Sequence, residues 1–330
     1  MKVIKILVLA FTLCLSGQRI LASECILKGE VRNRDSKVLV LHKCSENPKT
    51  MYENPIIIPI KNGTFQYTFS YSENEAYELV FQDELEAGSW RSIIFFPNAQ
   101  VEFVLYPLKD ANNNVIQGGV LNDELMRYQI EERNLFQPKF IELSKIGKAL
   151  KKENDYESKE YLAVQEQLRT TNPDDHEAKL PIYQKMDEMK KTRSQYTERG
   201  NLLMDRQDSL KKALYDWKYA YVTNNPSLAS YYIMWKDVFM EVKNDAHVAK
   251  LVVAAFPIFK KKYPNHVYTD KISSQLSGIQ TIVVGNRYVD FKAPTLTGDT
   301  LQLSTLISNK VALIDLWCKE DKLLVLPQTR

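Results

Sequence analysis

Alternating apolar and polar residues run along the chain from about residue 25 to residue 108 and predict β-strands. The clearest run spans residues 65–71, where four aromatic side chains alternate with polar ones. Asn62-Gly63 just before it predicts a two-residue hairpin turn, because both residues tolerate a positive φ. Short strands separated by polar turns are typical of a small β-sandwich or open barrel, which we place at residues 24–120. Further strands are expected at 26–31, 37–43, 76–82, 91–96 and 100–106.

The pattern becomes helical from residue 121 to residue 280. Leu210, Leu214, Trp217 and Tyr221 recur at three- and four-residue spacing, which predicts a helix face directed at a core. Short helix-breaking segments then separate three further helices. We expect these helices at 227–242, 246–262 and 267–280.

Charged residues and glutamine dominate residues 149–200, and apolar positions are sparse there. This composition favours one exposed helical hairpin. The interruption of the hairpin is expected at 171–175, where Asn172 or Asp174 could cap the second helix.

The last 46 residues, 285–330, change pattern again. Short β segments are expected on either side of a turn at Gly298-Asp299. Residues 311–317 form a nearly continuous apolar run, which is typical of a central strand buried on both faces.

The first 23 residues have the features of a signal peptide. Lys2 and Lys5 precede an apolar run at 6–15, and Ala22 and Ser23 are small residues at the expected cleavage point. The alternatives are a buried N-terminal helix, a membrane anchor and a lipoprotein signal. The apolar run is short for a membrane span, and no small residue precedes either nearby cysteine. We therefore expect export to the periplasm or cell envelope, with no membrane span once the signal is removed.

Composition and cysteine content limit which partners, disulfides and cofactors can be expected. A formal net charge of +3 in 330 residues gives no reason to expect a nucleic-acid partner. Cys25, Cys44 and Cys318 remain after signal removal. Cys25 and Cys44 fall on strands expected to be neighbours, so they form either a disulfide or two unpaired thiols. No Cys/His cluster has metal-ligand spacing, and no metal or other cofactor is expected.

The C-terminal segment resembles thioredoxin-like proteins of the alkyl hydroperoxide reductase and thiol-specific antioxidant group. The resemblance implies a thioredoxin-like α/β domain at 281–330 that follows a small β domain and a helical linker. The α+β chain would then be an exported relative of thiol–disulfide oxidoreductases. The features that carry the resemblance are Gly285, Asp290-Phe291, Gly298-Asp299, Leu303-Ser304, Asn309-Lys310 and the apolar run ending at Trp317.

The sequence departs from this family at the catalytic motif. The family requires Trp-Cys-x-x-Cys, in which the second cysteine resolves a mixed disulfide. Here Trp317 is followed by Cys318-Lys319-Glu320-Asp321, and no second cysteine follows. We therefore expect a truncated thioredoxin-like domain, with Cys318 as a candidate lone thiol. Either the gene product is truncated or frameshifted, or the chain is a natural variant that discarded the redox domain.

Two functions are compatible with these patterns. The chain is either a catalytically incomplete member of the oxidoreductase family or a non-enzymatic envelope protein that binds a partner through its β domain and helices. Periplasmic thiol or disulfide proteins are the partners implied by the first hypothesis. The patterns assign no oligomeric state.

An insulin-reduction assay tests whether the chain is catalytically incomplete. We expect no sustained reduction, because a lone Cys318 thiol has no second thiol to resolve a mixed disulfide. Robust turnover that is lost in Cys318→Ser would contradict this expectation.

Overall fold

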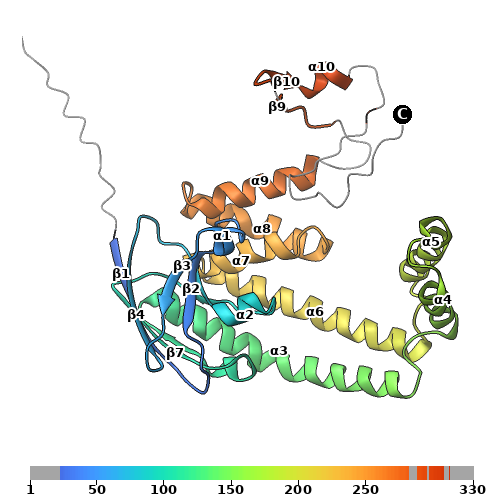
Figure 1. Ribbon diagram of the computed structural model, residues 1–330, viewed down its shortest axis with the longest axis horizontal. Coiled ribbons are helices and arrows are strands. Elements are labelled where there is room, and N and C mark those ends of the chain that lie inside the picture. Colours follow the sequence, from blue (N-terminus) through green and yellow to red (C-terminus); the bar gives the residue numbers. More distant parts are fainter. Residues whose placement is uncertain (1–22, 282–287, 296, 308–311, 313–330) are drawn as a thin grey trace, which may run out of the picture. The chain divides into compact units, whose positions relative to one another are not determined.

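The computed structural model describes residues 23–281, 288–295, 297–307 and 312 (Figure 1). The predicted α+β class is confirmed, with small sheets near the N-terminus and a helical central region. The chain divides into two compact units, Met1–Ile272 and Ser273–Arg330. The predicted signal peptide lies outside the described residues, except that Ser23 is the first residue of β1.

Two four-stranded sheets form the N-terminal part of the first unit, with strand orders β4-β1-β7-β8 and β3-β2-β5-β6. We call them the first and the second sheet. β1 lies parallel to β7, and all other described neighbours in these sheets are antiparallel. The strands are β1 (Ser23–Val31), β2 (Val38–Lys43), β3 (Ile56–Pro59), β4 (Thr64–Tyr71), β5 (Tyr77–Phe81), β6 (Ile93–Phe95), β7 (Gln100–Leu105) and β8 (Val115–Gln117).

The two sheets face each other across one hydrophobic core. Leu27 and Phe65 of the first sheet and Leu39, Leu79 and Phe95 of the second belong to the same buried cluster. Side chains alternate between the two faces of a strand, so every second residue of β1 and β4 points into this core. The β domain is therefore a sandwich of two sheets.

The second sheet is covered on its other face as well. Val40 and Val80 point away from the sandwich core and pack against Met51 of α1 (Thr50–Glu53) and Leu85 of α2 (Gln82–Glu86). Burial on both faces explains why β2 and β5 read as nearly continuous apolar runs. In the first sheet, the alternate residues of β4 that point away from the core are exposed.

The turn predicted at Asn62-Gly63 is confirmed, with φ of 51° and 73°. The strands on either side pair only at Lys61 and Thr64, and then β3 and β4 enter different sheets. The predicted hairpin turn is therefore present, and it connects one sheet to the other. The physical reason is that β3 and β4 approach the same core from opposite sides.

Helices form the rest of the first unit. Those predicted from residue 227 onward begin and end within two residues of the observed boundaries. After the 3-10 helix η1 (Leu108–Asn113), the helices are α3 (Val120–Lys152), α4 (Lys159–Thr170), α5 (His176–Thr192), α6 (Glu198–Asn224), α7 (Leu228–Met240), α8 (Ala246–Lys262) and α9 (Val267–Thr281), which crosses the boundary between the units.

The cap of α5 differs from the prediction. The Asp175 side chain accepts a hydrogen bond from the Ala178 N–H and caps the helix. Asn172 instead accepts from the Asp174 N–H, at 3.1 Å, and stabilises the turn that precedes the helix. The local turn therefore uses the side chain that we expected to cap the helix.

The long helices α3 and α6 lie side by side (Figure 1). The Trp217 ring stacks on Tyr128 of α3 with ring centroids 5.5 Å apart. The four residues of the predicted stripe are only half-buried, and the buried face of α6 includes Tyr219 and Val222 instead. Leu143, Leu150 and Leu203 extend the contact to the ends of the two helices. Because α3 continues to Lys152, the predicted exposed hairpin is shorter than expected and consists of α4 and α5, which share their own small core.

Hydrogen bonds join the sandwich to the helices. The buried Asn122 side chain of α3 accepts from the Phe96 N–H at 2.7 Å and donates to the Phe96 carbonyl at 2.8 Å. The Tyr268 hydroxyl of α9, which is also buried, accepts from the Ala76 N–H at 2.8 Å. Backbone groups at the ends of the second sheet therefore depend on helical side chains for their partners.

The second unit contains β9 (Lys292–Pro294), β10 (Thr300–Gln302) and α10 (Leu303–Ile307). The predicted turn is confirmed, with Gly298 at φ 89° between the two antiparallel strands. The Asp290 carboxylate accepts from the Ser304 N–H at 2.8 Å. The apolar run at 311–317 lies outside the described residues, apart from Ala312.

Replacing Tyr268 with phenylalanine tests the connection between the sandwich and the helices. The change leaves the buried Ala76 N–H without its acceptor, so we expect the free energy of unfolding to fall by about 1–3 kcal/mol. Urea denaturation measures the change, and Tyr183→Phe on the exposed face of α5 is the control. Equal losses in the two variants would contradict the proposed role of Tyr268.

Candidate functional site

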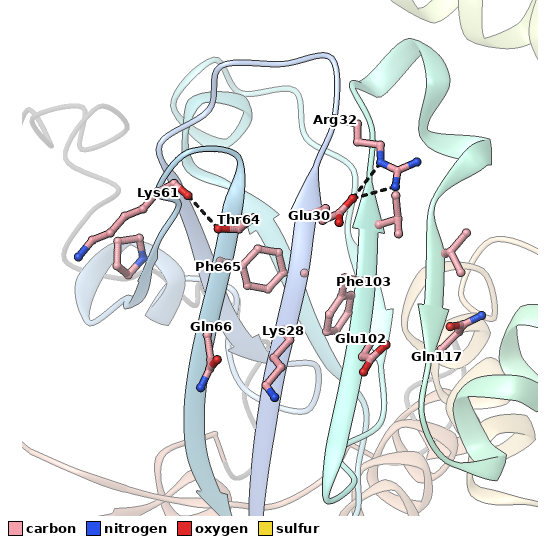
Figure 2. Close-up of a pocket in the computed structure, with 14 residues that line it drawn as sticks. Lys28, Glu30, Arg32, Lys61, Thr64, Phe65, Gln66, Glu102, Phe103 and Gln117 are labelled. Carbon is pink, nitrogen blue, oxygen red and sulfur yellow. Dashed lines mark hydrogen bonds and ion pairs between the residues drawn. The ribbon is translucent and has the colours of Figure 1, made fainter.

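The outer face of the first sheet is hollowed (Figure 2). The hollow has a volume of about 630 Å³ and is bordered by β1, β4, β7 and β8. Since alternate residues of a strand share a face, these four strands direct polar side chains into the same space. Its polar lining consists of Lys28, Glu30, Arg32, Lys61, Thr64, Gln66, Glu102 and Gln117.

Gly29 forms part of the floor of the hollow and lies opposite Phe65 on β4 and Phe103 on β7. A Cβ atom at this position would lie 2.5 Å from the Phe65 ring and 2.9 Å from Phe103 Cβ. Glycine therefore allows the two rings, whose centroids are 5.9 Å apart, to meet beneath β1. The polar hollow rests directly on an aromatic part of the core.

The charges of the hollow are only partly paired. Glu30 accepts from Arg32 at 2.8 Å, and Glu102 accepts from Gln100 at 2.6 Å. No hydrogen bond or ion pair joins the side chain of Lys28 or Lys61 to another side chain in the described part of the chain, although Lys28 lies opposite Glu102 in the register of β1 and β7. These two ammonium groups are therefore available to an anionic ligand.

The two cysteines of the described chain are both free and buried. Cys25 lies on β1 in the first sheet, whereas Cys44 follows β2 in the second. The expectation that they occupy neighbouring strands is wrong, because β1 pairs with β4 and β7 instead. No Cys25–Cys44 disulfide is present, and the candidate thiol Cys318 lies outside the described residues.

Burial raises the pKa of both thiols, and most strongly that of Cys44. Since the thiolate is the reactive form, both groups are poor nucleophiles at neutral pH. Cys25 belongs to the sandwich core, and Cys44 is close to Tyr232 of α7. Their environment is that of packing residues.

A buried histidine forms a second polar cluster, which the sequence did not reveal. His42 Nδ1 lies 3.0 Å from Glu78 Oε1, and His42 Nε2 lies 2.8 Å from Thr50 Oγ1. A hydroxyl, an imidazole and a carboxylate in this order occur in nucleophilic sites. Here, however, Thr50 donates its hydrogen to the Asn47 carbonyl at 2.8 Å. The cluster therefore attaches α1 to β2 and β5 and does not activate the hydroxyl.

An ion pair is buried between α6 and α7. Lys218 Nζ lies 2.9 Å from Asp237 Oδ1, and the ammonium group also lies 4.3 Å from the centre of the Tyr215 ring. Burial raises the pKa of Asp237, while the charge of Lys218 opposes that shift. Each charge is needed to neutralise the other, so we assign the pair a structural role.

The described ranges contain no candidate metal site and no helix that could span a membrane. Residues 23–281, 288–295, 297–307 and 312 contain no group of three or more His, Cys, Asp or Glu side chains placed to hold a metal ion. The helices of this part of the chain are all too short or too polar to cross a bilayer.

No protein-family model matches the chain, and no curated protein or solved structure matches it either. The thioredoxin-like resemblance therefore stays a prediction from the sequence.

The sequence did not predict that the residues of the hollow lie together. Alternation along each strand shows that Lys28, Gln66 and Glu102 point away from the core. It does not show that β1 lies between β4 and β7, which is what brings these side chains together. Gly29, in the middle of an alternating strand, was the available signal of a close approach.

Replacing Gly29 with valine tests the packing beneath the hollow. The added side chain would overlap the Phe65 ring, so we expect a loss of about 1–3 kcal/mol in the free energy of unfolding. Gly278→Ala is the control, because its added Cβ would meet nothing within 4 Å beyond its chain neighbours and the nearby backbone of α9. A Gly29→Val protein as stable as the parent in urea would show that the two rings do not require glycine.

Proposed function

We propose that this chain is an exported binding protein that holds its partner at the hollow on the first sheet. The observation that carries the proposal is the convergence of polar side chains from four strands on one concave surface. Strands of a packed sandwich hold such side chains in fixed relative positions, which lowers the entropy that is lost on binding.

The burial pattern of the sandwich supports this location. The second sheet is covered on its outer face by α1 and α2, which satisfies the apolar residues there. On the first sheet, Gln66 and Glu102 remain exposed on the outer face beside the half-buried Lys28. A surface of this kind forms hydrogen bonds and ion pairs with a polar partner and has no need of a covering helix.

We also propose that the chain is a relative of the thioredoxin-like oxidoreductases and works in the periplasm or cell envelope. The support is the order of the C-terminal motifs, together with the antiparallel β9–β10 pair around Gly298. In this proposal Cys318 contributes at most a single thiol to disulfide exchange, because Cys25 and Cys44 are buried. Binding by the sandwich would then be the principal activity of the chain.

Site-specific photocrosslinking in the cell envelope tests the binding proposal. A benzophenone amino acid in place of Gln66 should give discrete adducts on irradiation, because Gln66 lines the hollow. The same substitution at the exposed Lys191 of α5 should give none. Adducts of equal yield at both positions, or no adduct at Gln66, would contradict the proposal.

A further inference from the structure

β4 lies at the edge of the first sheet and is paired along one side only. Its eight residues all pair with β1, in a continuous register from Ser23 opposite Tyr71 to Glu30 opposite Thr64. β1 continues the sheet through β7 on its other side. β4 therefore offers one long, regular edge (Figure 2).

The hydrogen-bonding direction of each residue follows from the register. The Val31 N–H donates to the Gly63 carbonyl, which shows that odd-numbered residues of β1 face β4. The Ile26 N–H donates to the Ala99 carbonyl, so even-numbered residues face β7. Residues of an antiparallel pair exchange hydrogen bonds at every second position. The odd-numbered residues of β4 are thus the ones bonded to β1.

The even-numbered residues of β4 turn their backbone groups outward. Thr64 uses this direction to pair with Lys61 across the turn. Gln66, Thr68 and Ser70 have no backbone partner on that side within the described chain. Three N–H and three C=O groups are therefore available along the edge.

The edge lacks the features that usually prevent strand pairing. Proteins protect exposed edges with charged residues, proline or a bulge. The sequence from Thr64 to Tyr71 contains no charged residue and no proline, and its register with β1 is unbroken. This strand is open to a further strand.

The two faces beside the edge differ in chemistry. On the inner face, Tyr67, Phe69 and Tyr71 are only half-buried at the rim of the sandwich core. On the outer face, the hollow supplies the unpaired ammonium groups of Lys28 and Lys61. A strand added here would place alternate side chains against aromatic rings and against positive charge.

We propose that β4 binds an extended segment of another protein as an additional strand, and that this segment alternates apolar and acidic residues. The inference rests on the proposed function, since it names the partner of the same surface. Apolar side chains of the segment pack against Tyr67 and Phe69, and its carboxylates pair with Lys28 and Lys61. A second copy of β4 fits less well, because its side chains include no carboxylate.

A labelled ten-residue peptide of alternating valine and glutamate is the probe. Fluorescence anisotropy with the full chain should show saturable binding. Lys28→Glu combined with Lys61→Glu should weaken it about tenfold, since two attractive charge pairs become repulsive. Lys148→Glu combined with Lys191→Glu makes the same change in net charge on the helices and should leave binding unchanged. Equal weakening by both pairs would overturn the charge-matching part of the proposal.

Backbone N-methylation of the probe tests strand addition directly and does not depend on the folding of a variant. Only every second N–H of an added strand faces β4, so methylation of all valines and methylation of all glutamates must differ in effect. Loss of binding on glutamate methylation indicates an antiparallel strand, and loss on valine methylation indicates a parallel one. Equal affinities of the two methylated peptides would overturn the proposal.

Sedimentation separates this partner from a second copy of the chain. The proposal predicts that the β4 edge does not pair with a second copy of the chain. The molecular mass measured by sedimentation should therefore not depend on protein concentration. Thr68→Pro removes an outward N–H without breaking a bond to β1, and it should weaken peptide binding. A dimer that Thr68→Pro dissociates would overturn the proposal in favour of self-pairing. The two proposals can fail separately. If crosslinked adducts form at Gln66 but the two methylated peptides bind with equal affinity, the binding function stands and strand addition alone is rejected.

Discussion

Burial of two four-stranded sheets against each other is the constraint on which the rest of the structure depends. The second sheet is apolar on both faces and also requires α1 and α2. The first sheet is apolar on one face only, so its polar face remains in contact with solvent. Gly29 allows Phe65 and Phe103 to complete the core directly beneath that face. The hollow is thus a consequence of how the core is closed.

The helices are attached to the sandwich at positions that leave the outer face of the first sheet uncovered. Asn122 binds the backbone of Phe96 after β6, and Tyr268 binds the backbone of Ala76 before β5. Both connections are made at strand ends of the second sheet. The outer face of the first sheet and the edge of β4 take no part in them. The second sheet therefore holds the helices in place, and the outer face of the first sheet is available to bind a partner.

The buried polar groups follow the same division. Cys25, Cys44 and the cluster around His42 lie within packed regions, where their hydrogen bonds and burial explain them. Lys218 and Asp237 neutralise each other between two helices. The lysines of the hollow differ from all of these, because they are charged and accessible and have no partner in the described chain. Recognition of an acidic partner is the chemistry that such groups provide.

Local patterns of the sequence determined much of this protein. The positive φ values of Asn62 and Gly63, the alternation in β4 and the start of α7 after Ser227 depend on neighbouring residues alone. Strand order depends on contacts between distant segments, and only the tertiary structure decided that β1 lies between β4 and β7. That order separates Cys25 from Cys44 and gathers the polar residues of the hollow. It also leaves β4 at an edge, because pairing partners are selected by burial of the whole core and not by any one strand.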